Sequence, residues 1–104
     1  MFNEIKELSA SLDEMAHNMA KYGKEAAEAN RHYRQRVKEE VLKERDKGTP
    51  TTIITAIVKG TCSNEEFDRD CAEVFYKVAF EKIQIIKKQM EMINDEIRRE
   101  WGQK

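Results

Sequence analysis

The sequence predicts an all-α protein in which two long helices form an antiparallel hairpin with a short middle helix at the bend. First, 38% of the 104 residues are charged and 39% are hydrophobic, which is typical of long helices. Second, the glycines and the single proline leave two long segments almost uninterrupted. Third, apolar residues in both long segments recur at alternating steps of three and four. We expect residues 1–104 to form one helical-hairpin domain.

The first helix is expected over residues 2–47. This segment has no proline and a single glycine, Gly23. Gly48 suits the left-handed position that follows the end of a helix. The apolar positions form a heptad seam, meaning a stripe with a mean spacing of 3.5 residues: Ile5, Leu8, Leu12, Met15, Met19, Tyr22, Ala26, Ala29 and Tyr33.

The middle helix is expected over residues 50–59. Thr49 can cap this helix, and Pro50 suits its first turn, where the missing N–H costs no hydrogen bond. Gly60 can end it. The β-branched residues at 51–55 would also suit a short strand, so this alternative stays open.

The last helix is expected over residues 64–102. Ser63 and Glu66 have the S-x-x-E spacing of a capping box. Its seam residues repeat the three-four alternation: Tyr76, Ala79, Ile83, Ile86, Met90, Ile93 and Ile97.

Folding the chain at the middle segment brings the two seams together in one register. In each facing pair the two residue numbers total 108 or 109. The pairs are Leu12 with Ile97, Met15 with Ile93, Met19 with Met90, Tyr22 with Ile86, Ala26 with Ile83, Ala29 with Ala79, and Tyr33 with Tyr76. Seven consecutive layers satisfied together favour the antiparallel hairpin. Trp101 would then close the apolar end of the seam opposite Leu8.

A second apolar face on each long helix predicts self-association. The first helix carries small residues at helical spacing: Ala16, Ala20, Gly23 and Ala27. The last helix carries Cys71, Val78, Ile85 and Met92 at intervals of seven, with Phe67 and Val74 beside the start of this row. Since burial of such side chains stabilises by about 25 cal/mol per Å2, we expect a homodimer or higher oligomer resembling a four-helix bundle. The alternative is that both faces are used within one chain.

Basic residues concentrate in the second half of the first helix. Arg31, Arg34, Arg36 and Lys38 have no acidic residue among them. Positions 24, 31, 38 and 45 are all basic and seven apart, which predicts a basic face where phosphates could lie. The alternative is an ordinary solvated face. The net charge of −1 argues against a DNA mimic and against a histone-like binder.

Arg36 falls on the seam, where a guanidinium needs a partner. The register predicts a salt bridge to Asp70 or Glu73. The alternative is an anion pocket near the bend. Its guanidinium clamps would be Arg36 and Arg69, and its stacking surfaces would be Tyr33 and Tyr76.

No grouping of residues indicates catalysis, a metal or a cofactor. Glu14 and His17 form an E-x-x-H, but the facing stretch lacks the second copy that a di-metal bundle needs. Cys71 is expected in the core, and the turn position of Cys62 suggests exposure, with nothing nearby to activate its thiol. We therefore expect a protein that is not an enzyme and has no cofactor.

No leader-like start and no membrane-length apolar run can be recognised, so a soluble, cytoplasmic protein without membrane contact is expected.

Several segments near the bend and the C-terminus form a recognisable pattern: Tyr33-Arg34, Gly48-Thr49-Pro50, Ile53-Ile54, Gly60, Arg69-Asp70, Ala72 and Arg98-Arg99-Glu100-Trp101. This pattern resembles small uncharacterised helical proteins of phages and prophages of Gram-positive bacteria. The resemblance implies an accessory factor that acts by binding in the host bacterial cytoplasm.

Two functions remain. The first is a non-enzymatic, oligomeric interaction protein that binds a host or phage protein. The alternative is a binder of phosphate ligands, either a nucleotide signal of host defence or a nucleic acid, through the basic residues of 31–38.

Overall fold

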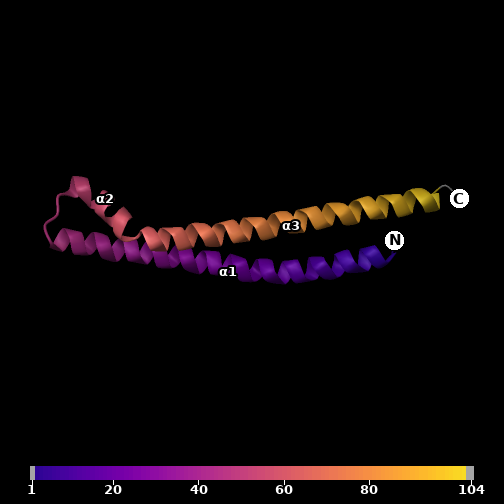
Figure 1. The fold of residues 1–104 in the computed structure, drawn as a ribbon, viewed down its shortest axis with the longest axis horizontal. Helices are drawn as coiled ribbons and strands as arrows, with labels where there is room; N and C mark the ends of the chain where they lie inside the picture. Colours follow the sequence, from indigo (N-terminus) through magenta and orange to yellow (C-terminus); the bar gives the residue numbers. More distant parts are fainter. Residues whose placement is uncertain (1, 103–104) are drawn as a thin grey trace. The chain divides into compact units, whose positions relative to one another are not determined.

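The computed structural model describes residues 2–102, which form three helices and contain no strand (Figure 1). The helices are α1 (Phe2–Asp46), α2 (Thr51–Thr61) and α3 (Ser63–Gly102). The all-α prediction is confirmed, and residues 51–55 form the predicted helix rather than the alternative strand. Contacts group the chain into two units. Unit 1 joins residues 2–22 of α1 to residues 76–102 of α3, and unit 2 comprises residues 23–75.

The end of α1 confirms the prediction for Gly48, whose φ of 79° lies in the left-handed region. The Gly48 N–H donates to the Arg45 carbonyl at 3.0 Å, and the Thr49 N–H donates to the Glu44 carbonyl at 3.0 Å. These two bonds form a Schellman motif, which satisfies carbonyls that the helix end would leave open. Thr49 does not cap α2 as expected. Its hydroxyl instead donates to Glu44 Oε2 at 2.7 Å and reinforces the end of α1.

The junction between α2 and α3 is tighter than predicted. Gly60 does not end α2, because the helix continues through Thr61 and Cys62 occupies its C-cap. Nor does Ser63 cap α3, since the helix already includes it. The Cys62 carbonyl accepts the Glu66 N–H at 3.0 Å, so Cys62 closes one helix and opens the next.

The core of unit 2 lies under α2. Ile54, Val58 and Cys62 are buried at successive four-residue steps along one face of the short helix. Half-buried residues of α1 pack against them, namely Tyr33, Val37 and Val41. Cys62 is fully buried, which overturns the expectation that its turn position exposes it. Burial also raises the pKa of the Cys62 thiol, with a further rise from nearby Glu65.

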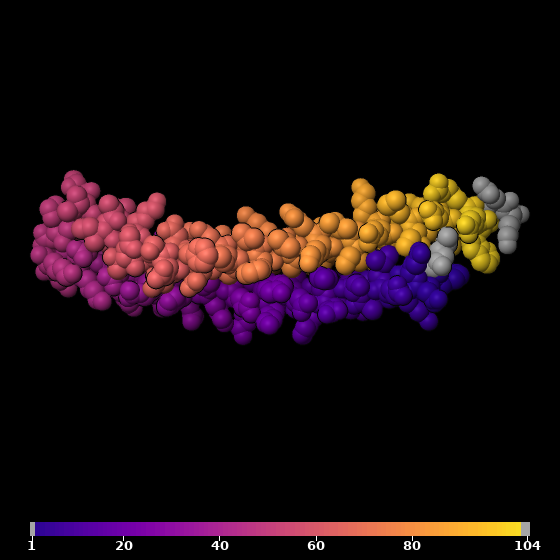
Figure 2. Space-filling view, in the orientation of Figure 1, coloured from indigo at the N-terminus to yellow at the C-terminus, as the bar shows by residue number. Residues whose placement is uncertain are grey.

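In unit 1 the N-terminal part of α1 lies antiparallel to the C-terminal part of α3 (Figures 1 and 2). The seam positions of residues 2–22 are all half-buried, while most residues between them are exposed. On α3, Ala79 and Ile83 are buried, and Ile86, Met90, Ile93 and Ile97 are half-buried. The heptad pattern therefore identifies the face that each helix buries.

The register between α1 and α3 differs from the predicted one by about one heptad. In unit 2, Arg69 rather than Tyr76 lies over Tyr33, with its guanidinium carbon 4.4 Å from the ring centroid. In unit 1, Leu8 lines a groove together with Ile93, whereas the predicted register places Leu8 opposite Trp101. A heptad seam looks the same after a shift of seven residues, so periodicity alone does not choose between the two registers.

The shift explains why Trp101 does not close the seam as expected. Displaced by seven residues, Trp101 falls past the first turn of α1, and 63% of its surface is exposed. The same shift places Ala79 at the level of Tyr22 and Ile83 at the level of Met19. Ala79 and Ile83 are the two buried residues of the described α3. In the first of these layers the small Ala79 leaves room for the large Tyr22.

Candidate functional site

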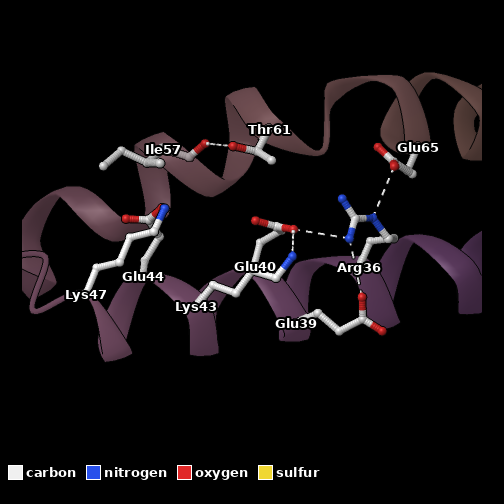
Figure 3. Close-up of polar contacts among 9 residues, drawn as sticks. All are labelled: Arg36, Glu39, Glu40, Lys43, Glu44, Lys47, Ile57, Thr61 and Glu65. Atoms are coloured by element: carbon white, nitrogen blue, oxygen red, sulfur yellow. Dashed lines mark hydrogen bonds and ion pairs between the residues drawn. The ribbon is translucent and has the colours of Figure 1, made fainter.

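Arg36 lies at the centre of a cluster of three carboxylates (Figure 3). Its Nε donates to Glu65 Oε1 of α3 at 3.2 Å, and its Nη1 lies 3.3 Å from Glu39 Oε2 and 3.1 Å from Glu40 Oε1 of α1. The predicted partners, Asp70 and Glu73, are therefore wrong. The displaced register brings the first turn of α3, rather than its third, opposite Arg36.

Within this cluster, Arg36 and Glu65 each stabilise the charged form of the other. The backbone N–H of Glu65 and the Arg36 guanidinium lower the pKa of the Glu65 carboxyl. Hydrogen bonds to Glu65 and Glu39 raise the pKa of Arg36. Because three carboxylates surround this guanidinium, a ligand anion would have to compete with carboxylates that are already in place. The cluster acts as a clasp between α1 and α3.

The other members of the expected anion pocket are also engaged or separated. Arg69 stacks on Tyr33 and donates from Nη2 to Asp70 Oδ1 at 2.9 Å, with Glu66 Oε1 at 3.9 Å. Tyr76 belongs to unit 1 and lines a shallow hollow on α3 with Lys77, Phe80 and Glu81. A phosphate-binding role for Arg36, Arg69, Tyr33 and Tyr76 thus stays a prediction.

Arg31, Arg34 and Lys38 lie together on the exposed face of α1. With Gln35 they line an open hollow of about 340 Å3. Among residues 2–102, no carboxylate forms an ion pair with any of the three. Among the basic residues expected to bind an anion, these three are therefore the ones that are not already paired with a carboxylate.

The predicted interface residues of α3 are exposed. In unit 1, Val78 is 42% exposed, Ile85 59% and Met92 60%. We call these three residues the α3 row. In unit 2, Val74 is 56% exposed. On α1, Ala16, Ala20 and Ala27 are exposed and Gly23 is half-buried.

An aromatic hollow on α3 was missed by the sequence reasoning. Phe67, Asp70, Cys71, Val74 and Phe75 line a hollow of about 210 Å3 in unit 2, and both phenylalanines are largely exposed. Cys71, expected in the core, is half-buried in its wall. Phe75 belongs neither to the seam nor to the seven-residue row. A large aromatic residue outside both apolar stripes was the sequence signal that could have indicated this exposed surface.

A groove between α1 and α3 of unit 1 was also not foreseen. It has a volume of about 560 Å3, with Leu8, Met92 and Ile93 supplying apolar surface. Three carboxylates, those of Glu4, Glu7 and Glu96, line it as well. Its existence depends on the register, which is why the sequence did not reveal it.

In the described part of the chain, no three His, Cys, Asp or Glu side chains are grouped so that they could hold a metal ion. None of the helices of residues 2–102 has the length and apolar character needed to span a membrane.

Comparisons with protein-family models, curated proteins and solved structures find no match to this chain, so its surfaces alone bear on its function.

Proposed function

We propose that this protein is a non-enzymatic helical interaction protein that works as an oligomer and binds other polypeptides through α3. The observation that carries the proposal is the exposed α3 row. Val78, Ile85 and Met92 are large apolar side chains, and each is exposed. Exposed apolar patches of this kind are typical of protein–protein contact surfaces.

Exposed apolar side chains in both units support an oligomer. They include Val78 and Ile85 in unit 1 and Phe67 and Val74 in unit 2. The aromatic hollow in unit 2 offers a second apolar surface for a different partner. The resemblance to phage proteins supports a host or phage protein in a bacterial cytoplasm as that partner.

Native mass spectrometry of the wild type and two variants tests the oligomer. Ile85→Lys places a charge in the α3 row and is expected to give monomers. Gln84→Lys adds the same charge at the neighbouring exposed position outside the row, so it is expected to leave the oligomer intact. A wild-type protein that stays monomeric at high micromolar concentration would overturn the proposal.

A second candidate function is phosphate binding by the basic face. The unpaired, exposed Arg31, Arg34 and Lys38 support it. The triple alanine variant is expected to weaken binding of a fluorescent oligonucleotide or nucleotide without changing stability. Arg36→Ala, by contrast, is expected to destabilise the fold, because Arg36 clasps α3. A steep fall of affinity with salt indicates many phosphate contacts and hence a strand rather than a nucleotide. Equal binding by the triple variant would exclude this face.

A further inference from the structure

The α3 row is flanked by two charges of opposite sign. Glu81 lies four residues before Ile85 and Lys88 three residues after it. At 100° per residue, both fall on the same side of the row, within about 60° of Ile85. Both are exposed, and neither forms an ion pair with another described residue.

We propose that α3 pairs with α3 of a second copy in an antiparallel arrangement, about a two-fold axis near Ile85. This inference rests on the proposed function and specifies its oligomer interface. Around that axis Ile85 meets Ile85 of the partner subunit, and Val78 meets Met92 of the partner subunit. A two-fold interface must be self-complementary, and a row with Ile85 at its centre satisfies this condition.

The two flanking charges fit the antiparallel direction. In the antiparallel arrangement Glu81 faces Lys88 of the partner subunit, and the symmetry produces the pair twice. In a parallel, in-register arrangement the two-fold axis runs along the helices and places the two copies of each charge on opposite flanks, so the Glu81–Lys88 pair does not form. A second copy in the antiparallel direction is therefore an occupant whose charges complement those of the row.

A charge-exchange experiment tests the direction at low ionic strength. Glu81→Lys alone leaves two lysines on the flank, and Lys88→Glu alone leaves two glutamates. Each single variant should dissociate at about tenfold higher concentration than the wild type, or more. Mixing the two single variants should restore association as a heterodimer, and the double variant E81K/K88E should associate like the wild type. Because these residues are exposed in the chain, the variants are expected to keep its helical content, which circular dichroism checks.

Cross-linking tests the register independently. In a Cys71→Ser background, Val78→Cys mixed with Met92→Cys should give mainly the mixed disulfide under mild oxidation. Cys62 is buried and should stay unreacted. A parallel interface would instead cross-link each variant to itself.

The outcomes separate this inference from the proposed function. If the wild type associates but the mixed charge variants do not recover and the mixed disulfide does not form, the antiparallel interface is wrong and the oligomer remains. If the wild type never associates, both are wrong. Recovery in the mixture together with the mixed disulfide establishes the interface.

Discussion

At the residue scale, Arg36 shows how a charged side chain can occupy a seam position. Its guanidinium is partly exposed and reaches Glu39, Glu40 and Glu65, so it is not left without a partner. Glu40 also pairs with Lys43, at 3.3 Å, which extends the network along α1 (Figure 3). The contact to Glu65 is the one that joins two helices, since the others lie within α1.

The lowered pKa of Glu65 predicts a pH-dependent contribution to stability. A depressed folded-state pKa stabilises the fold above the unfolded-state value, about 4.3 for glutamate, and this contribution is lost as the pH falls through the folded-state pKa. We expect Glu65→Gln to lower the free energy of unfolding at pH 7. The difference from the wild type should shrink below about pH 4.

Urea unfolding followed by circular dichroism across this pH range provides the measurement. Glu28→Gln is the matched control, because Glu28 is exposed and has no ion pair in the described chain. A constant difference between Glu65→Gln and the wild type down to pH 3 would show that the pair with Arg36 does not stabilise the fold.

At the scale of the elements, α2 holds unit 2 together. The Schellman motif at Gly48 ends α1 and lets the chain reverse into Pro50 and α2. Ile54 and Val58 then pack against α1, and Cys62 joins α2 directly to α3. A change in the turn or in this small core should affect the whole unit.

Two glycines, one before α2 and one within it, predict effects of opposite sign. Gly48 has a positive φ, so Gly48→Ala should destabilise by about 1 kcal/mol. Gly60 lies inside α2 with open space around its Cα, so Gly60→Ala should stabilise by about 0.5–1 kcal/mol. The free energies of unfolding of the two variants provide the measurement. Destabilisation by Gly60→Ala would mean that α2 is not helical at this position.

Neighbouring isoleucines test the core of unit 2. Ile54 is buried, and Ile54→Ala should cost about 2 kcal/mol or more. Ile53→Ala removes the same atoms at a position that is 47% exposed, so it should cost less than about 1 kcal/mol. Thermal and urea unfolding should rank them in this order. Equal losses would indicate that α2 does not present this face to α1.

At the scale of the whole molecule, little apolar surface is buried. The buried hydrophobic residues are Ile54, Val58, Cys62, Ala79 and Ile83, and large side chains elsewhere on α3 stay exposed. The proposed association would add buried apolar surface to so thin a core. The stability of the chain should therefore depend on its concentration.

We expect the thermal midpoint of the wild type to rise with protein concentration, because association stabilises the folded state by mass action. Ile85→Lys should have a lower midpoint that does not change with concentration. Calorimetry or circular dichroism over a hundredfold range of concentration provides the measurement. A midpoint of the wild type that stays constant over that range would mean that folding does not require a second copy.

Much of the fold could be predicted because its signals are local. Gly48 ends α1 as its conformational freedom predicts, and the three-four spacing identifies the buried face of both long helices. The caps at Thr49 and Ser63 were wrong because the Thr49 hydroxyl donates to Glu44 of α1, and because α3 already includes Ser63 and its first turn starts from the Cys62 carbonyl. The basic face and the α3 row were readable from spacing, whereas the partners of Arg36 and Arg69 were not.

By itself, the sequence determined the helical class, the number and approximate limits of the helices, and which face of each helix avoids water. These properties depend on residue type and on periods of a few residues. Only the tertiary structure decided the register between α1 and α3, and with it the pairing of Arg36 with Glu65 and the groove of unit 1. The physical reason is that a heptad seam is nearly degenerate under a shift of seven residues. The choice therefore depends on how large and small side chains and opposite charges fit across the two helices.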